Sequence, residues 1–474
     1  MIASFEAKTS RTTLLRDLSA LDLAFFLAES ENSPKHVAGL TLLRKPDPCP
    51  RNFVSRLVEE LKTFDEPTEP FNLVIRFAGL TGPHWEMARH FDISQHVFYH
   101  RPAKSSTWLE VKDFVARLHE PLMDRSRPLW EYHMIDGIED RRFAVYIKIH
   151  HAYADGMTMT SWLDRTLARS PDDQRLQPVW TMPAARKVRR RSSPSPLERV
   201  RHLGGEVRNQ VQTAGGMAKL ATQQVLERAG LTRKAVSLQF ATAHDTPLTG
   251  SASPGRSIAT TFLPMDDIRR VCDATRLTLN HVVLACIDAA MHRHLQQVGF
   301  GVDHPLTIQM PVNLRKDGDS GSGNRVGVAL VELADPQADP LRRLQQIGHS
   351  LDRVRHQFDS VPSHSVQQYT VLSALANELI EKVWLSNRIP ATGHTLVSNV
   401  PGPKGPLYLR GARVEQMYPI SILVPGLRTN ITLFSCSGVL NFGIVATHDL
   451  PQPDLLARYI NEEFRNLEKR VVEG

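Results

Sequence analysis

The sequence predicts an α/β or α+β protein built from two halves, and two observations carry this prediction. Segments with the period of helices and segments with the period of strands interleave in both halves. Between them, residues 171–256 hold clusters of proline, serine and glycine and only a weakly apolar helical face, which predicts a basic, partly helical crossover linker. We therefore expect an N-terminal unit over 1–170 and a C-terminal unit over 257–474.

Both periods occur in the first half. Ser19 and Asp22 fit a capping box that opens a helix through Phe26. Apolar residues three and four apart predict two further helices, over 53–64 and 108–118. Alternation predicts a strand over 143–151. Ser105 or Ser106 is the expected cap of the second of these helices.

The second half alternates helices with strands. Periodicity and end signals predict helices over 265–275, 279–297, 340–358, 365–386 and 453–470. Strands are expected over 258–263, 306–312, 395–400, 420–424 and 429–447, the last as a hairpin turning at Ser437-Gly438.

Composition bounds the class of protein. The chain has 474 residues, 41% of them hydrophobic, which suits two or three globular domains. No window approaches the ~18 consecutive apolar residues of a membrane span, and the N-terminus lacks the layout of a signal peptide. The four cysteines form no C-x-x-C pair, so neither a disulfide framework nor a zinc knuckle is expected. We expect a protein of the reducing cytosol.

The positive charge is concentrated in one place. The chain carries 57 basic and 50 acidic residues, a balance of +7. Arg186–Arg201 contains seven basic residues and one acidic residue, a local +6, which leaves about +1 for the rest. No aromatic residue lies within the basic run, so no nucleic-acid partner is expected. A solvated linker or a contact with anionic lipid fits better, since each basic residue near such a surface contributes ~1 kcal/mol.

Several common active-site motifs are missing from the sequence. It contains no G-x-S-x-G elbow, no phosphate loop ending in G-K-[ST], no H-E-x-x-H and no G-x-G-x-x-G after a strand. Serine hydrolases of the elbow type, nucleoside triphosphatases, zincins and dinucleotide oxidoreductases therefore lose support.

A pair of histidines ends the predicted strand 143–151. Alternation places His151 on the apolar face of this strand and His150 on the more polar face. An imidazole in apolar surroundings stays neutral and can accept a proton near pH 7. Asp155 and Gly156 then form a tight turn before a helix beginning near Met157. A structural interpretation stays open, with His151 as a core histidine and Asp155 as a helix cap.

The string His150-His151-Ala152-Tyr153-Ala154-Asp155-Gly156 resembles the active-site motif of a superfamily of acyltransferases. That superfamily includes chloramphenicol acetyltransferase, the condensation domains of peptide synthetases and bacterial wax ester synthase/diacylglycerol acyltransferases. Other strings resemble the last branch: His36-Val37-Ala38-Gly39-Leu40, Pro128-Leu129-Trp130, Pro311-Val312-Asn313-Leu314-Arg315, Ser398-Asn399-Val400-Pro401-Gly402-Pro403, Leu407-Tyr408 and Gly411-Ala412. The resemblance extends from about Leu18 to Leu467.

This resemblance implies two chloramphenicol-acetyltransferase-like subdomains, each a mixed sheet with helices, with a tunnel between them. It implies transfer of a fatty acyl group from acyl-coenzyme A to a long-chain alcohol or to diacylglycerol. His151 would be the general base for direct attack by the hydroxyl, a role that typically contributes ~10²–10⁴ in rate. His150 would support it, and Asp155 would mainly hold the loop. No acyl-enzyme is then required.

Other site positions follow from the same resemblance. Asn280 follows Thr278, a plausible cap, and its place in a first helical turn makes it a candidate oxyanion donor or a simple helix-end hydrogen-bond partner. The family has Asn-Asp here, whereas this chain has Asn280-His281. Gly156, Pro128, Trp130, Ser398 and Asn399 complete the expected substrate-binding set, although the last two also fit a tight turn.

The expected partners are acyl-coenzyme A, the acceptor lipid and a lipid surface. No metal or redox cofactor is expected, because the coenzyme A thioester is itself a substrate. The basic run is an alternative site for the coenzyme A phosphates. An apolar stripe of Leu14, Leu18, Leu21 and Phe25 fits burial or docking on a membrane or lipid droplet. We expect a cytoplasmic protein peripherally associated with the inner membrane or lipid inclusions.

Two other functions stay open from the sequence. A condensation-type enzyme that uses carrier-bound acyl groups shares the histidine motif, although the Pro-Leu-Trp and Ser-Asn-Val-Pro-Gly-Pro strings disfavour it. A non-catalytic lipid-surface-binding relative could keep the same fold, although the intact His151 and Asp155 disfavour that as well.

Overall fold

The structure is a computed structural model of the chain. It describes residues 16–18, 20–77, 83–154, 156–182, 245–313, 326–359, 378 and 391–473. Several sequence expectations lie outside these ranges: Leu14, Ser19, Asp155, the basic run Arg186–Arg201, the weak helix in the crossover, and the helix expected over 365–386 apart from Glu378.

The N-terminal sheet has six strands in the order β12-β13-β2-β7-β6-β5. They are β2 (His36–Arg44), β5 (Val97–His100), β6 (Trp130–Ile138), β7 (Arg142–His150), β12 (Tyr408–Leu409) and β13 (Ala412–Ile420). Helices in this half are α1 (Ala20–Ala28), α2 (Phe53–Lys62), α3 (Trp108–His119) and α4 (Gly156–Thr166), with 3₁₀ turns η1 (Ile93–Gln95) and η2 (Val179–Thr181). A small sheet of β1 (Arg16–Asp17), β4 (His84–Met87) and β3 (Leu73–Arg76) lies beside it.

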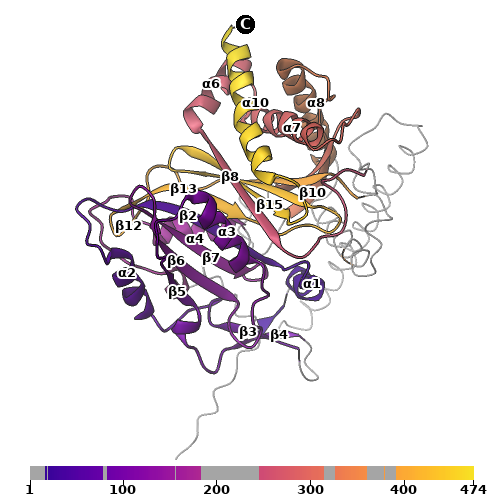
Figure 1. The fold of residues 1–474 in the computed structure, drawn as a ribbon. Coiled ribbons are helices and arrows are strands. Elements are labelled where there is room, and N and C mark those ends of the chain that lie inside the picture. Colours follow the sequence, from indigo (N-terminus) through magenta and orange to yellow (C-terminus); the bar gives the residue numbers. More distant parts are fainter. Residues whose placement is uncertain are drawn as a thin grey trace, which may run out of the picture.

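The C-terminal sheet also has six strands, in the order β10-β9-β11-β14-β15-β8. They are β8 (Arg256–Pro264), β9 (Thr307–Asn313), β10 (Val326–Glu332), β11 (Thr395–Val400), β14 (Thr429–Cys436) and β15 (Val439–Thr447). Figure 1 shows its helices gathered on one side: α6 (Met265–Thr275), α7 (Leu279–Gln297), α8 (Pro340–Asp359) and α10 (Pro453–Glu473). Both six-stranded sheets contain parallel and antiparallel pairs, so the predicted mixed α/β class is confirmed.

Two strands from late in the sequence complete the N-terminal sheet. β13 pairs antiparallel with β2, Met417 opposite Thr41, and β12 extends the edge beyond it. The segment 257–474 therefore contributes to both sheets. Alternation along a strand reveals which face is apolar but not which strand is its partner, so the sequence pattern did not predict this crossing.

Several predicted elements are confirmed closely. Helices occur at Met265–Thr275 and Leu279–Gln297 as expected, and the hairpin turns at Ser437-Gly438. Both turn residues have positive φ, 52° and 81°, as a two-residue hairpin turn of type I′ requires.

Two expectations about element ends are wrong. Of the strand expected over 420–424, only Ile420 lies in a strand, as the last residue of β13. Residues 421–424 have no regular secondary structure, and the carbonyl of Ile422 accepts from the Asn430 side chain instead of from a neighbouring strand. The cap of α3 is Thr107 rather than either serine. Its backbone N–H donates to Glu110 and its hydroxyl accepts from the Glu110 N–H, which satisfies two otherwise unpaired donors.

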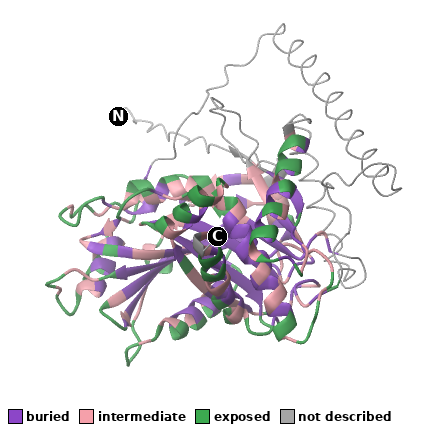
Figure 2. Cartoon of the chain, turned by 90° about the horizontal axis from the view of Figure 1, so that it is seen from above, coloured by how far each residue is buried: buried purple, intermediate pink, exposed green. Residues whose placement is uncertain are grey.

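The hydrophobic core is divided between the two sheets. One large cluster joins α7, α8 and α10 to the C-terminal sheet, and another fills the cavity-facing side of the N-terminal sheet. Figure 2 shows buried residues following the strands, while the outer faces of the helices are exposed. No helix among the described residues is both long enough and apolar enough to cross a membrane.

Candidate active site

An apolar cavity of about 220 Å³ lies between the two six-stranded sheets. Its walls come from β2, β7, β13 and α4 on the side of the N-terminal sheet and from β11 and β14 of the C-terminal sheet on the other. His151, Gly156 and Ser398 of the sequence-predicted set line this cavity. The space suits a hydrocarbon chain, because most of its lining side chains are aliphatic or aromatic.

His151 lies at the end of the row of β7 side chains that faces the cavity. Val145, Ile147 and Ile149 line the cavity from the same face of the strand, which confirms the alternation predicted from the sequence. The His151 ring stacks on the Phe25 ring of α1, with 4.4 Å between centroids. Its backbone N–H donates to the carbonyl of Lys35 across 2.8 Å. One imidazole is thus held half-buried beside an apolar space.

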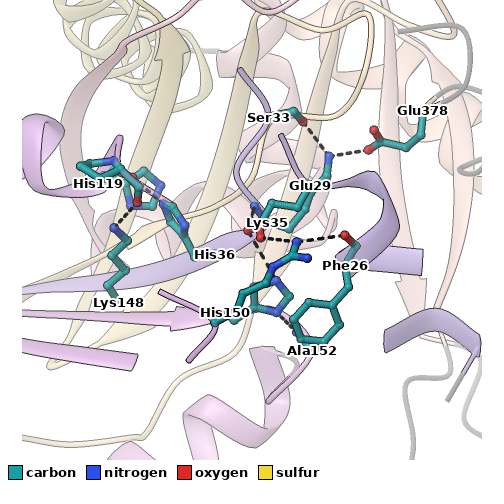
Figure 3. A network of polar contacts seen from close by, with 12 residues as sticks. Phe26, Glu29, Ser33, Lys35, His36, His119, Lys148, His150, Ala152 and Glu378 are labelled. Carbon is teal, nitrogen blue, oxygen red and sulfur yellow. Dashed lines mark hydrogen bonds and ion pairs between the residues drawn. The ribbon is translucent and has the colours of Figure 1, made fainter. Parts of the chain in front are cut away.

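His150 points to the other side of the sheet and is 1% exposed. Its ring stacks on Phe26, with centroids 4.2 Å apart, and its Nδ1 accepts from the Ala152 N–H at 3.2 Å. Its Nε2 lies 3.5 Å from a carboxylate oxygen of Glu29. Both residues are labelled in Figure 3. His150 therefore fixes the end of β7 without lining the cavity.

Glu29 is a buried carboxylate that the sequence analysis missed. It accepts from the Arg125 guanidinium at 2.9 Å and from the Lys35 backbone N–H at 3.2 Å. Burial alone would raise its pKa, but His150, Arg125 and the Lys35 N–H together lower the pKa to about 2. Glu29 thus remains a carboxylate that links α1 to the histidine pair.

Lys35 lies immediately before β2 and is 1% exposed. Its Nζ donates to the Ser33 hydroxyl at 2.7 Å and to the Glu378 carboxylate (Figure 3). Burial lowers the pKa of Lys35, and Glu378 opposes that effect. Because the Lys35 carbonyl accepts the His151 N–H, this ion pair anchors the backbone beside the candidate base.

The Pro128-Leu129-Trp130 segment is hydrogen-bonded to the segment that carries the two histidines. The carbonyl of Leu129 accepts the His150 N–H at 3.0 Å, and the Leu129 N–H donates to the Tyr153 hydroxyl at 2.9 Å. Trp130 is 1% exposed and donates its indole N–H to the Phe71 carbonyl. Neither Pro128 nor Trp130 is among the described residues that line the cavity.

Gly156 begins α4 at the point where that helix meets the other half of the molecule. A β-carbon on Gly156 would lie 3.2 Å from Cγ2 of Val400 on β11. Two strings quoted from distant parts of the sequence therefore meet here. Asp155, next to Gly156, lies outside the described residues.

Asn280 and Asn399 contact each other at the surface. The Asn399 side-chain amide donates to the Asn280 side-chain oxygen at 2.8 Å, and both residues are exposed. Ser398 and Val400 line the cavity from β11, so Asn399 between them faces away. Neither asparagine is among the described lining residues, and their bond connects the start of α7 to β11.

His281 helps to cap α7, at the position where the family has an acidic residue. Its Nδ1 accepts from the Thr278 backbone N–H at 3.3 Å. Burial lowers the pKa of His281, which favours the neutral imidazole that such acceptance needs. The departure from Asn-Asp therefore leaves the cap of α7 intact.

Two signals in the sequence could have drawn attention to the residues that were missed. Glu29 directly follows the apolar segment Ala20–Ala28, and Lys35 directly precedes an apolar strand. A charged residue at such a junction is buried only when it is paired. The partners Arg125 and Glu378 lie far away in the sequence, so the pairing itself was not predictable.

Family models match most of the chain. The model described as the wax ester synthase/diacylglycerol acyltransferase catalytic domain matches residues 18–283, and the one described as the WS/DGAT C-terminal domain matches residues 322–468. The chain belongs to the wax ester synthase/diacylglycerol acyltransferase family. A Mycobacterium bovis protein described as a diacylglycerol O-acyltransferase is 32% identical over 456 residues, which are 95% of this chain and 98% of that protein.

Solved structures agree with the family assignment. The wax ester synthase/diacylglycerol acyltransferase from Marinobacter aquaeolei VT8 superposes with a TM-score of 0.75 at 27% identity, covering 96% of this chain and 100% of that one. The first condensation domain of the calcium-dependent antibiotic synthetase superposes with a TM-score of 0.60 at 13% identity, with 97% of each chain covered. The second likeness shows a shared fold.

Proposed function

We propose that this family member is an acyl-coenzyme A-dependent O-acyltransferase that makes wax esters, triacylglycerols or both. The single observation that carries the proposal is the position of His151, an imidazole at the end of an apolar cavity between the two sheets. An imidazole there can take a proton from a hydroxyl while the fatty chain lies in the cavity.

The proposed reaction needs no covalent intermediate on the protein. His151 accepts the hydroxyl proton as the alcohol oxygen attacks the thioester carbonyl. The new C–O bond forms, the C–S bond breaks, and the protonated imidazole returns the proton to the leaving thiolate, which departs as coenzyme A. The network of Glu29, Lys35 and His150 positions the backbone of His151 during these steps.

Asp155, Asn280 and Asn399 take different parts in this proposal. Asp155 holds the turn between His151 and α4, as the motif implies. The bond between Asn280 and Asn399 supports a tether between α7 and β11 rather than an oxyanion contact. Ser398 and Gly156 form part of the wall that contacts the substrate.

A coenzyme A release assay tests the proposal. The purified protein is given a long-chain acyl-coenzyme A with primary alcohols of graded length, with diacylglycerol, and with amines. We expect release with at least one hydroxyl acceptor, and loss of release of about 10²-fold or more in His151→Ala. His90→Ala, at an exposed histidine, is the matched control. Near-normal turnover of a folded His151→Ala would refute the assigned base.

The two alternatives give different results in the same assay. A condensation-type enzyme would prefer an amine acceptor, and a non-catalytic relative would release no coenzyme A with any acceptor. Two observations favour the O-acyltransferase: the family models match residues 18–283 and 322–468, and His151 lines the cavity.

We also propose that the protein works at a lipid surface, either a membrane or a lipid inclusion. The proposed acceptors partition into lipid. In addition, the Leu27 side chain of α1 lies beside the site and is 54% exposed. Phe77 is 47% exposed and packs against Phe26, which belongs to α1. The guanidinium of Arg125 lies over the rings of both phenylalanines. Apolar side chains with an adjacent cation favour an interfacial position.

Flotation with lipid vesicles tests this second proposal. Leu27→Ser/Phe77→Ser should bind vesicles more weakly than the wild type while keeping turnover on a soluble, short-chain substrate. A second variant that neutralises the basic residues of 186–191 measures the contribution of that run, with zwitterionic vesicles as its control. Unchanged flotation of both variants would refute a lipid-surface role for these residues.

A further inference from the structure

A glycine interrupts the row of β2 side chains that faces the cavity. Val37, Gly39, Thr41 and Leu43 alternate along this strand and line the cavity. β2 is an interior strand that hydrogen-bonds to β13 on one side and to β7 on the other. Glycine inside such a strand is unfavourable relative to alanine, because it leaves the backbone more freedom to lose and offers no side chain to pack.

Neither the backbone nor crowding requires a glycine at position 39. Its φ is not positive, so any residue can adopt its conformation. A β-carbon built on Gly39 would meet no atom within 4 Å. Gly443 shows the opposite case, since a β-carbon there would lie 1.7 Å from the Pro419 carbonyl oxygen. The remaining reason for an interior glycine is close approach of a ligand to the backbone.

The neighbours of Gly39 indicate where this ligand lies. Gly39 is in register with Pro419 on β13 and with Ile147 on β7, and Ile147 is in register with Tyr132 on β6. All four residues line the cavity. Pro419, Gly39 and Ile147 are only half-buried although they sit on interior strands, because the cavity reaches the sheet along this row.

The row lies well away from the candidate base. Lys35, whose carbonyl accepts the His151 N–H, is four residues before Gly39. At ~3.3 Å per residue, an extended chain covers roughly 13 Å between them. Only a substrate with a long hydrocarbon chain reaches from His151 to this row.

We propose that Gly39 determines the longest hydrocarbon chain that the cavity accepts, by leaving open the space that a side chain would fill. The inference rests on the proposed acyltransfer and deepens it by naming a specificity-determining residue. The chain that passes Gly39 belongs either to the acyl group or to the alcohol. A side chain at position 39 would close the cavity at that depth for one of the two.

Graded substitutions test the proposal. Gly39→Ala, Gly39→Val and Gly39→Leu are assayed for kcat/KM in two series, one varying the acyl-coenzyme A chain at a fixed acceptor and one varying the alcohol at a fixed acyl chain. In one series we expect the short chains to be retained and the long chains to lose about 10–200-fold for each methylene excluded. The series that changes identifies which chain lies along Gly39.

Gly301→Leu is the matched control. A β-carbon at Gly301 also meets no atom within 4 Å, but Gly301 is exposed and outside the cavity lining. The proposal is overturned if folded Gly39→Leu keeps the wild-type length profile in both series, or if its kcat/KM falls equally at every length. If the wild type releases no coenzyme A, the proposed function fails instead. Calorimetric binding of fatty alcohols of graded length to the same variants then still tests Gly39.

Discussion

Gly156 at the start of α4 and Val400 near the end of β11 approach so closely that a β-carbon on the glycine would lie 3.2 Å from the valine methyl group. The contact joins the helix that follows the histidine motif to a strand of the other sheet. It explains why the position after Asp155 holds a residue without a side chain, since α4 would otherwise have to move away from β11.

Gly156→Ala should therefore disturb the fit between the two halves. We expect a loss of about 1–3 kcal/mol in the free energy of unfolding, because the neighbouring methyl groups must shift to admit the new one. Denaturant titration measures this. Gly156→Ala/Val400→Ala should recover part of the loss, and a single variant as stable as the wild type would contradict the packing argument.

The turn after β11 depends on a second glycine. A β-carbon on Gly402 would lie 2.1 Å from the Ser435 carbonyl oxygen and 2.7 Å from the Phe434 ring, so the backbone itself must move. Gly402→Ala should fold poorly or lose about 4 kcal/mol or more in the free energy of unfolding, which is in the upper range for point substitutions. Gly301→Ala, at a glycine with open space, should change stability by less than about 0.5 kcal/mol. Similar melting temperatures for the two variants would refute this prediction.

The buried pair of Lys35 and Glu378 should affect both stability and turnover. Lys35→Met leaves the Glu378 carboxylate, which is 12% exposed, without its cation. This should cost about 3–5 kcal/mol in the free energy of unfolding. The freed backbone of residue 35 would also let the His151 N–H move, and a shift of ~1 Å costs ~10²-fold in rate. Urea unfolding and kcat measure the two effects separately.

The controls for this pair are the double variant and an exposed ion pair. Lys35→Met/Glu378→Gln should be more stable than Lys35→Met alone, because no unpaired charge remains. Arg44→Met breaks an exposed contact with Glu415 and should cost at most about 1 kcal/mol. Equal effects at the buried and the exposed pair would contradict the anchoring role.

Glu29 should make the protein more stable near neutral pH than in acid. Its pKa falls from 4.5 to about 2 on folding, so its carboxylate contributes roughly 3 kcal/mol above pH 4.5, and this contribution is lost as the pH falls toward 2. Glu29→Gln lacks the ionisation. The stability difference between wild type and variant should shrink to less than half between pH 7 and pH 3, measured by denaturant unfolding. A difference independent of pH would refute the shift.

The sequence was informative where the signal is local. The helix Leu279–Gln297, the turn at Ser437-Gly438 and the cavity-facing side of β7 follow from periodicity and turn chemistry, and the structure has them as predicted. Alternation along the same strand also gave the face on which His151 lies, whereas its role as the base came from the resemblance of the motif and stays a prediction.

The rest of the site depends on contacts between distant segments. Glu29 meets Arg125, and Lys35 meets Glu378, across 96 and 343 residues of sequence. The apolar segments next to Glu29 and Lys35 are a local sign of burial, but the partners that make this burial possible are brought together only by tertiary packing. Trp130 also shows that a motif does not determine the surroundings of a side chain. Its motif predicted a substrate contact, whereas its side chain packs in the core.

The exchange of β13 into the N-terminal sheet has a consequence for biosynthesis. While the ribosome is still producing the first four hundred residues, the β2 edge that receives Ala412–Ile420 has no partner from its own chain. An unpaired edge of apolar strand invites pairing with other nascent chains. Cutting the gene within 171–256 would therefore yield two insoluble fragments, and co-expression of the two fragments should restore solubility.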